Sequence, residues 1–207
     1  MSHAIIRLMN DEFRDIHEST AFKRLHEYPI IAAIRDFSDI ERVFHTPVRV
    51  VFLMGGDIQG ITRTVRKLQD VGKTVFVHID LCRGLAGDRE GMLFLCNEAK
   101  PDGVVSTRIN LLKVAKKLTV LTVQQLFVID TQAFETGVRN IREFAPDAIE
   151  VMPGLMPRVI KELKKETEIP ILAAGLIKSF AEVQLAIEAG ATAVVAGAPE
   201  LWDFTFE

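Results

Sequence analysis

The chain has 207 residues, of which 48% are apolar, and its formal net charge is −3. This composition is typical of a globular protein, and no apolar run reaches the length of a membrane span. The acidic balance argues against a wholly basic nucleic-acid-binding domain, whereas a local basic face stays compatible with it.

The chain begins with an N-terminal extension, residues 1–28, for which we expect a helix over Asp11–His26. Eight short apolar runs follow it. They are Pro29–Ile34, Val48–Met54, Lys73–Asp80, Asp102–Ser106, Leu121–Gln125, Asp147–Met152, Ile169–Ala174 and Ala193–Gly197. Each run is nearly continuous in apolar, often β-branched residues, which is typical of parallel strands buried on both faces.

Segments of helical period separate these runs. They include Ile58–Val71, Leu111–Leu118, Val159–Leu163 and Phe180–Ala189. We expect Asp57, Asp88 and Ser179 to cap helix N-termini and Gly190 to end a helix.

Strand and helix therefore alternate eight times, which predicts an α/β fold: a single-domain (β/α)8 TIM barrel over residues 29–207. An open doubly wound sheet is the weaker alternative, because the first strand runs into Arg35–Ser38 without the expected glycines. The barrel is lean, since about 250 residues is typical of this fold.

In such a barrel the site lies at the C-terminal ends of the strands. Two glycines there are informative: Gly175-Leu176 ends the seventh strand and Gly197-Ala198 ends the eighth, before a short helix expected at Pro199–Trp202. Backbone amides at these two places commonly bind phosphate, and glycine allows close approach. The alternative interpretation is that both are merely turn glycines.

Charged residues also close several strands. We expect Asp80 and Glu150 to face each other across the mouth, with His78 pointing inward beside Asp80. The carboxylates suit recognition of a polyol, Mg²⁺ binding, general acid–base work or simple turn capping. Arg35 and Arg108 would supply cations to an anionic ligand or form surface ion pairs. No cofactor is predicted, and Mg²⁺ stays open.

Two segments are locally basic. One carries Arg63, Arg66 and Lys67, and the other carries Lys113, Lys116 and Lys117. On outer helices they would form either a phosphate-contacting surface for RNA or ordinary solvated faces. With one Trp and one Tyr in the chain, no aromatic platform for stacking bases is evident.

Several segments in fixed order resemble the glycerol-3-phosphate-responsive antiterminator family. They are KTVFVHIDLCRGLAGD (Lys73–Asp88), PDGVVSTR (Pro101–Arg108), QQLFVIDTQA (Gln124–Ala133), PDAIEVMPGLMPRVI (Pro146–Ile160) and AAGLI (Ala173–Ile177). The likeness runs from about Pro29 to Trp202. It implies a TIM barrel that senses glycerol 3-phosphate and binds the leader mRNA of a glycerol uptake operon, without catalysis. The ligand positions it implies are Asp80, Ser106, Glu150, Gly175 and the turn after strand eight.

The chain departs from the family pattern in three places. Gln125 replaces an arginine, so we expect the contact of that arginine with an anion or an acidic neighbour to be lost. Ala174 replaces the first glycine of a pair. Ala196-Gly197 replaces Thr-Ser, which removes a hydroxyl donor and keeps the backbone site.

Three hypotheses follow: a regulator that senses a ligand and binds RNA, a TIM-barrel enzyme acting on a phosphorylated ligand, and a barrel retained for interaction alone. The paired glycines argue against the last. We expect a cytoplasmic protein with free Cys82 and Cys96 and no membrane partner, because the sequence shows no export signal. The apolar segment Leu201–Phe206, expected to be exposed, suits either self-association into a homo-oligomer or packing on the barrel.

Overall fold

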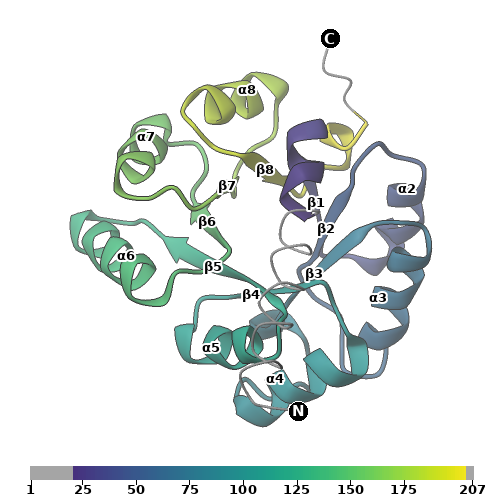
Figure 1. Cartoon of the computed structure of the whole chain (residues 1–207). Helices are drawn as coiled ribbons and strands as arrows, with labels where there is room; N and C mark the ends of the chain where they lie inside the picture. The colour runs from purple at the N-terminus through teal and green to yellow at the C-terminus, as the bar shows by residue number, and fades with distance from the viewer. Residues whose placement is uncertain (1–20, 204–207) are drawn as a thin grey trace.

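Eight parallel strands close into a barrel in the computed structural model, which describes residues 21–203 (Figure 1). Each strand pairs with its neighbours in chain order, and β1 pairs with β8. The strands are β1 Ile30–Ile34, β2 Val50–Leu53, β3 Thr74–His78, β4 Gly103–Ser106, β5 Leu121–Phe127, β6 Ala148–Met152, β7 Ile171–Ala174 and β8 Ala193–Ala196. The predicted TIM barrel is confirmed.

Helices surround the strands (Figure 1). They are α2 Ile40–Phe44, α3 Ile61–Asp70, α4 Arg89–Phe94, α5 Ile109–Lys117, α6 Thr131–Phe144, α7 Pro157–Glu166 and α8 Phe180–Glu188. Short helical turns lie at η1 Phe37–Asp39, η2 Ile79–Leu81, η3 Leu95–Ala99 and η4 Pro199–Leu201. Within residues 21–203, no helix is long and apolar enough to cross a membrane.

The predicted helix caps are largely confirmed. Asp88 accepts a hydrogen bond from Gly91 N at 2.8 Å, and Ser179 forms a capping box with Glu182. The cap predicted at Asp57 is wrong, since α3 begins later with Gly60 at its N-cap position. Asp57 instead accepts from Gly60 N at 2.9 Å and holds the turn before the helix.

Side chains alternate along each strand between two apolar layers. The outer layer packs the strands against the helices, and the inner layer fills the barrel with residues such as Ile31, Phe52 and Phe76. The same alternation puts polar residues inside at the C-terminal ends of β1, β3, β5 and β6. The apolar filling therefore gives way to a polar mouth.

The opposite end of the barrel is closed by the described part of the N-terminal extension. Residues 21–27 are helical, and Ala21 and Leu25 belong to the inner apolar layer. Arg24 donates to Gly72 O and to Thr74 Oγ1, both at 2.9 Å, at the start of β3. The remainder of the helix expected over Asp11–His26 lies outside the described residues.

The end of β8 is tied to this closed side. Trp202 is fully buried and donates from Nε1 to Ala196 O at 2.8 Å, while Tyr28 donates from its hydroxyl to Trp202 O at 2.9 Å. Leu201 is buried as well. The expectation of an exposed apolar segment is therefore wrong for these two residues, because both pack on the barrel. Residues 204–207 lie outside the described part of the chain.

Candidate functional site

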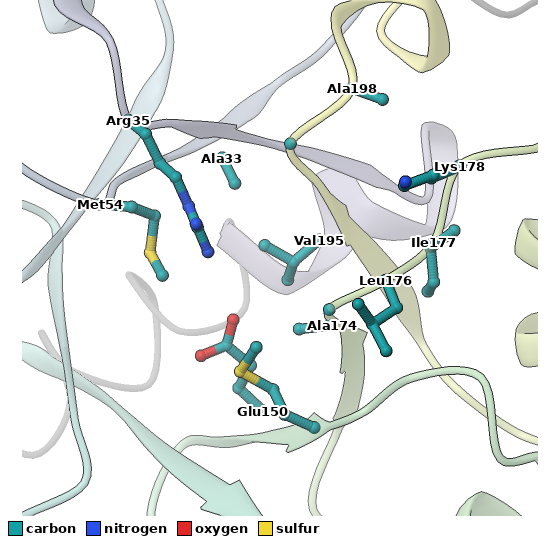
Figure 2. A pocket seen from close by; sticks show the side chains of 13 residues that line it. Ala33, Arg35, Met54, Glu150, Ala174, Leu176, Ile177, Lys178, Val195 and Ala198 are labelled. Atoms are coloured by element: carbon teal, nitrogen blue, oxygen red, sulfur yellow. The ribbon is translucent and has the colours of Figure 1, made fainter.

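A pocket of about 370 Å³ opens at the barrel mouth between β1, β6, β7 and β8 (Figure 2). It contains six of the residues predicted to bind ligand. They are Arg35, Glu150, Gly175, Leu176, Gly197 and Ala198. Its apolar lining comes from Ala33, Met54, Met152, Ala174, Ile177 and Val195, and Lys178 completes it. The strand-seven and strand-eight turns therefore meet in one concave site.

The turn after β7 has an unusual backbone. Gly175 and Leu176 both have positive φ, +80° and +65°. The left-handed φ favours glycine at position 175, whereas the nearest atom to a Cβ there is Met152 Cε at 2.7 Å, the end of a flexible side chain that can move. Leu176 is a rare non-glycine in this region and is 67% exposed, an outlier of the kind that clusters at ligand-binding turns.

The start of α8 fixes the end of the same turn. Glu182 Oε2 accepts from the backbone N–H groups of Lys178 and Ser179, at 2.7 and 2.9 Å. Reciprocal capping of this kind orders the first turn of a helix. These hydrogen bonds therefore order the backbone at Lys178 and Ser179, where the turn that borders the pocket enters α8.

Two cations line the pocket. Arg35 follows β1, and its guanidinium extends toward the Glu150 carboxylate, while Lys178 reaches in from the β7–α8 turn (Figure 2). Arg35 was predicted from its place at a strand end. Lys178 was missed, although a lysine three residues after Gly175 in a predicted phosphate turn was a usable signal.

Glu150 lies at the base of the pocket and is completely buried. Its Oε2 accepts from Gln125 Nε2 at 2.7 Å, whereas its Oε1 has no hydrogen-bond partner among the described residues. Burial raises the pKa of Glu150 to about 7, against the opposing effects of the Gln125 hydrogen bond and the Arg35 charge. A buried polar atom without a partner is costly, so Oε1 is available to a ligand hydroxyl.

Gln125 connects Glu150 to a buried histidine. Its Oε1 accepts from His78 Nε2 at 3.2 Å. Burial lowers the pKa of His78, although Gln125 and the Asp80 charge oppose this effect. The sequence predicted that position 125 would lose its contact with an acidic neighbour, and this prediction is wrong. The glutamine amide reaches Glu150 because the two residues are paired across β5 and β6.

Asp80, Ser106 and Arg108 form a separate cluster outside the pocket lining. Asp80 Oδ2 accepts from Ser106 Oγ at 2.8 Å and from Thr107 N at 3.1 Å. Its Oδ1 accepts from Arg108 Nε at 2.8 Å, and Arg108 also donates to Gly87 O at 2.6 Å. Burial raises the pKa of Asp80, but these hydrogen bonds, first that of Arg108, outweigh burial and lower it.

This cluster bears on three expectations about the strand ends. β3 ends at His78 and Asp80 lies in the following turn, yet the two side chains are adjacent as expected, with His78 Nδ1 3.9 Å from Asp80 Oδ2. Arg108 forms an ion pair with Asp80 and is not one of the pocket cations. Asp80 and Glu150 have different hydrogen-bond donors, and their facing each other across the mouth stays a prediction. Residues 21–203 contain no group of three His, Cys, Asp or Glu that could hold a metal.

The six predicted RNA-contacting residues lie on α3 and α5, as expected. Lys67 forms an ion pair with Glu41 at 3.3 Å and lies over the Phe44 ring. Lys116 donates to Ala145 O and lies over the Phe144 ring. The exposed cations on these faces are Arg63, Arg66, Lys67, Lys113 and Lys117, and Lys116 is half-buried.

Comparison with known proteins gives consistent matches. A family model described as "Glycerol-3-phosphate responsive antiterminator" matches residues 30–202. The glycerol uptake operon antiterminator regulatory protein of Listeria monocytogenes is 34% identical, with a TM-score of 0.83, over 86% of this chain and 96% of that chain. A glycerol uptake operon antiterminator-related protein of Thermotoga maritima is 31% identical, with a TM-score of 0.76, over 84% and 98% of the two chains.

A curated relative is similar over a comparable share of the chain. The uncharacterized protein YgcP of Escherichia coli is 28% identical over 178 residues, which are 86% of this chain and 93% of that protein. The likeness thus covers the barrel as a whole, with both turns of the pocket.

Proposed function

Because the chain belongs to the family of glycerol-3-phosphate responsive antiterminators, we propose that it binds glycerol 3-phosphate and then an mRNA leader of a glycerol uptake operon, allowing transcription to pass a terminator. The observation that carries this proposal is the pocket at the mouth, where two backbone turns, two cations and one buried carboxylate converge.

The pocket has complementary ends for such a ligand. Backbone N–H groups of the Gly175-Leu176 and Gly197-Ala198 turns, with Lys178, suit the phosphate. Glu150 Oε1 suits a glycerol hydroxyl, because a buried acceptor without a partner favours a ligand that donates to it. Arg35 lies between the carboxylate and the open mouth and would contact either the phosphate or a hydroxyl.

The ligand part of the proposal is tested by thermal unfolding with increasing glycerol 3-phosphate. A ligand that binds only the folded state stabilises it by mass action, by about 2.7 kcal/mol at 100 times Kd. We expect stabilisation by glycerol 3-phosphate and much less by glycerol or by inorganic phosphate alone. No shift at millimolar glycerol 3-phosphate would refute this part.

The RNA part depends on α3 and α5, whose exposed cations would contact phosphates. Replacing both Lys113 and Lys117 by Gln should reduce the salt dependence of leader RNA binding by a slope of about 2. The matched control replaces Lys161 and Lys165, on α7, in the same way. Equal salt slopes for the two double variants would place the RNA elsewhere. This role predicts a cytoplasmic protein, and a homo-oligomer is compatible with it.

A phospho-ligand enzyme of the same barrel type is the second candidate. The observation that favours it is Glu150, whose pKa of about 7 suits proton transfer at neutral pH. Turnover of glycerol 3-phosphate or a sugar phosphate, with or without Mg²⁺, would support this candidate. Binding without turnover, together with ligand-dependent RNA binding, supports the regulator.

A further inference from the structure

A second hollow of about 430 Å³, which we call the β5–α6 groove, lies at the mouth beside the ligand pocket. It is formed by the C-terminal end of β5, the turn into α6 and one face of α6, with Thr107 from the turn after β4. A volume of this size falls within the range of small-molecule sites. None of the residues predicted to bind ligand or RNA lines this groove.

Apolar side chains at the edge of the groove are unusually exposed. Phe127 is 53% exposed and Ile129 is 82% exposed, and both line it. Phe127 lies on the same face of β5 as Gln125, two residues further toward the mouth. A large exposed aromatic beside a concave surface is a common mark of a binding site.

The opposite wall is polar but uncharged. Gln132, Thr136 and Asn140 are spaced four residues apart on α6, so their side chains share one helix face along the groove. Amide and hydroxyl groups both donate and accept hydrogen bonds, as the edge of a nucleobase requires. The one charged residue lining the groove, Asp130, caps α6 by accepting from Ala133 N at 2.7 Å. With no cation in its lining, the groove is ill-suited to a phosphate.

The neighbouring helix supplies positive charge. Helix α5 packs beside α6 and carries Lys113, Lys116 and Lys117 with no acidic side chain in residues 109–117. Lys116 lies at the C-terminal end of α6, where it donates to Ala145 O, so Lys113, one turn earlier on α5, is the cation closer to the mouth. A nucleotide with its base in the groove would direct its phosphates toward such a surface. A flat apolar ring, a polar wall and neighbouring cations together match single-stranded RNA better than an apolar peptide.

Gln125 links the groove to the ligand pocket. Gln125 lines the groove, and its amide donates to Glu150, which lines the pocket. A ligand that engages Glu150 would therefore act on a residue in the wall of the groove. This contact gives a direct physical route by which ligand in one site can alter affinity in the other.

We propose that the β5–α6 groove binds an unpaired base of single-stranded RNA, stacked on Phe127 and hydrogen-bonded by the polar face of α6. The proposal rests on the proposed function, because it specifies where the RNA of that function is read. It differs from the contacts expected on α3 and α5, which would bind phosphates without reading bases.

The test measures fluorescence anisotropy of a labelled random-sequence single-stranded RNA about 20 nucleotides long, which exceeds the ~4–16 nucleotides that one binding fold covers. Titrations are run with and without saturating glycerol 3-phosphate. Loss of one stacked base should make Phe127→Ala bind about fivefold to 100-fold more weakly. Phe127→Tyr keeps the ring and should bind nearly as tightly as the wild type. Phe94→Ala, at a 37% exposed phenylalanine on α4, is the matched control and should change nothing.

A second measurement identifies the contact directly. The same RNA carrying 5-iodouridine is photocrosslinked, and the attached peptide is mapped by mass spectrometry. We expect attachment within β5 or the β5–α6 turn, at Phe127. Thermal unfolding measures whether Phe127→Ala still binds glycerol 3-phosphate. Its binding should match that of the wild type, which would show that the variant is folded.

The outcomes separate this proposal from the function on which it rests. If the wild type binds RNA and Phe127→Ala binds it equally, the groove proposal is overturned while the regulatory role stands. If the wild type binds this random-sequence RNA under neither condition, the groove proposal fails, whereas the regulatory role is refuted only by absence of binding to the leader RNA. If Phe127→Ala changes the oligomeric state measured by sedimentation and leaves RNA affinity intact, the exposed ring belongs to a protein interface instead.

Discussion

The buried carboxylate of Glu150 provides a quantitative test of the site. Its pKa rises from 4.5 to about 7 on folding, because burial disfavours the charged form. The folded protein therefore keeps a proton that the unfolded chain has released between these two pH values. Stability must fall as pH rises through that window, by about 1.4 kcal/mol per pH unit, and level off above pH 7.

The substitution Glu150→Gln removes this effect and keeps a neutral side chain of the same shape. The amide oxygen still accepts from Gln125 Nε2, so packing and one hydrogen bond are preserved. Because the pKa rises from 4.5 to about 7, the variant should become more stable than the wild type by about 3 kcal/mol at pH 8. Near pH 4.5 the two proteins should be nearly equal, since Glu150 is protonated when folded.

The assay is urea unfolding without ligand at several values between pH 4.5 and 8.5. The difference in free energy of unfolding between variant and wild type isolates Glu150, because both proteins share their other titrating groups. Glu168→Gln, at a side chain that is 95% exposed, is the control and should give a small, pH-independent difference. A flat difference for Glu150→Gln, or a variant less stable at pH 8, would refute a raised pKa at this position.

Three further outcomes are expected. Gly175→Val should abolish glycerol 3-phosphate binding in calorimetry, because a β-branched residue strains the left-handed backbone of this turn. Gly197→Ala, where a Cβ meets nothing closer than 4.0 Å, should still bind, and loss of binding there would contradict the backbone argument. Lys178→Met should weaken binding about tenfold and make it less sensitive to salt, whereas unchanged affinity would remove this lysine from the phosphate site. Trp202→Phe should lower the free energy of unfolding by about 1–3 kcal/mol in urea titrations, since it removes a buried hydrogen bond; an unchanged midpoint would contradict this.

The barrel was predictable because each strand is a short apolar run followed by a helix, a pattern that parallel sheets require. Glu150, Gly175 and Gly197 were placed correctly for a related reason: a strand end in such a barrel faces the mouth. These predictions depend on local sequence and on a general property of the fold. Neither requires knowledge of particular long-range contacts.

The errors have the opposite cause. Arg108 was expected at the pocket, but its partner Asp80 lies 28 residues earlier in the chain and pairs with it outside the pocket lining. Asp80 followed an apolar run without a break, so its departure from β3 was not visible in the pattern. Gln125 was interpreted as an arginine that had been lost. Its contact with Glu150 depends instead on the strand register that sets the two residues opposite each other. Long-range pairing of this kind is set by the folded structure.

The hydrogen bond between Tyr28 and Trp202 has a consequence for folding during synthesis. Strand β1 is made first, yet its edge is completed only by β8, and this hydrogen bond needs residue 202. During synthesis the early strands must wait with an open edge until the last strand has left the ribosome. Under the proposed function, a nascent chain could not respond to glycerol 3-phosphate until then. Each new molecule would therefore begin to sense the ligand only after its translation is finished and its barrel has closed.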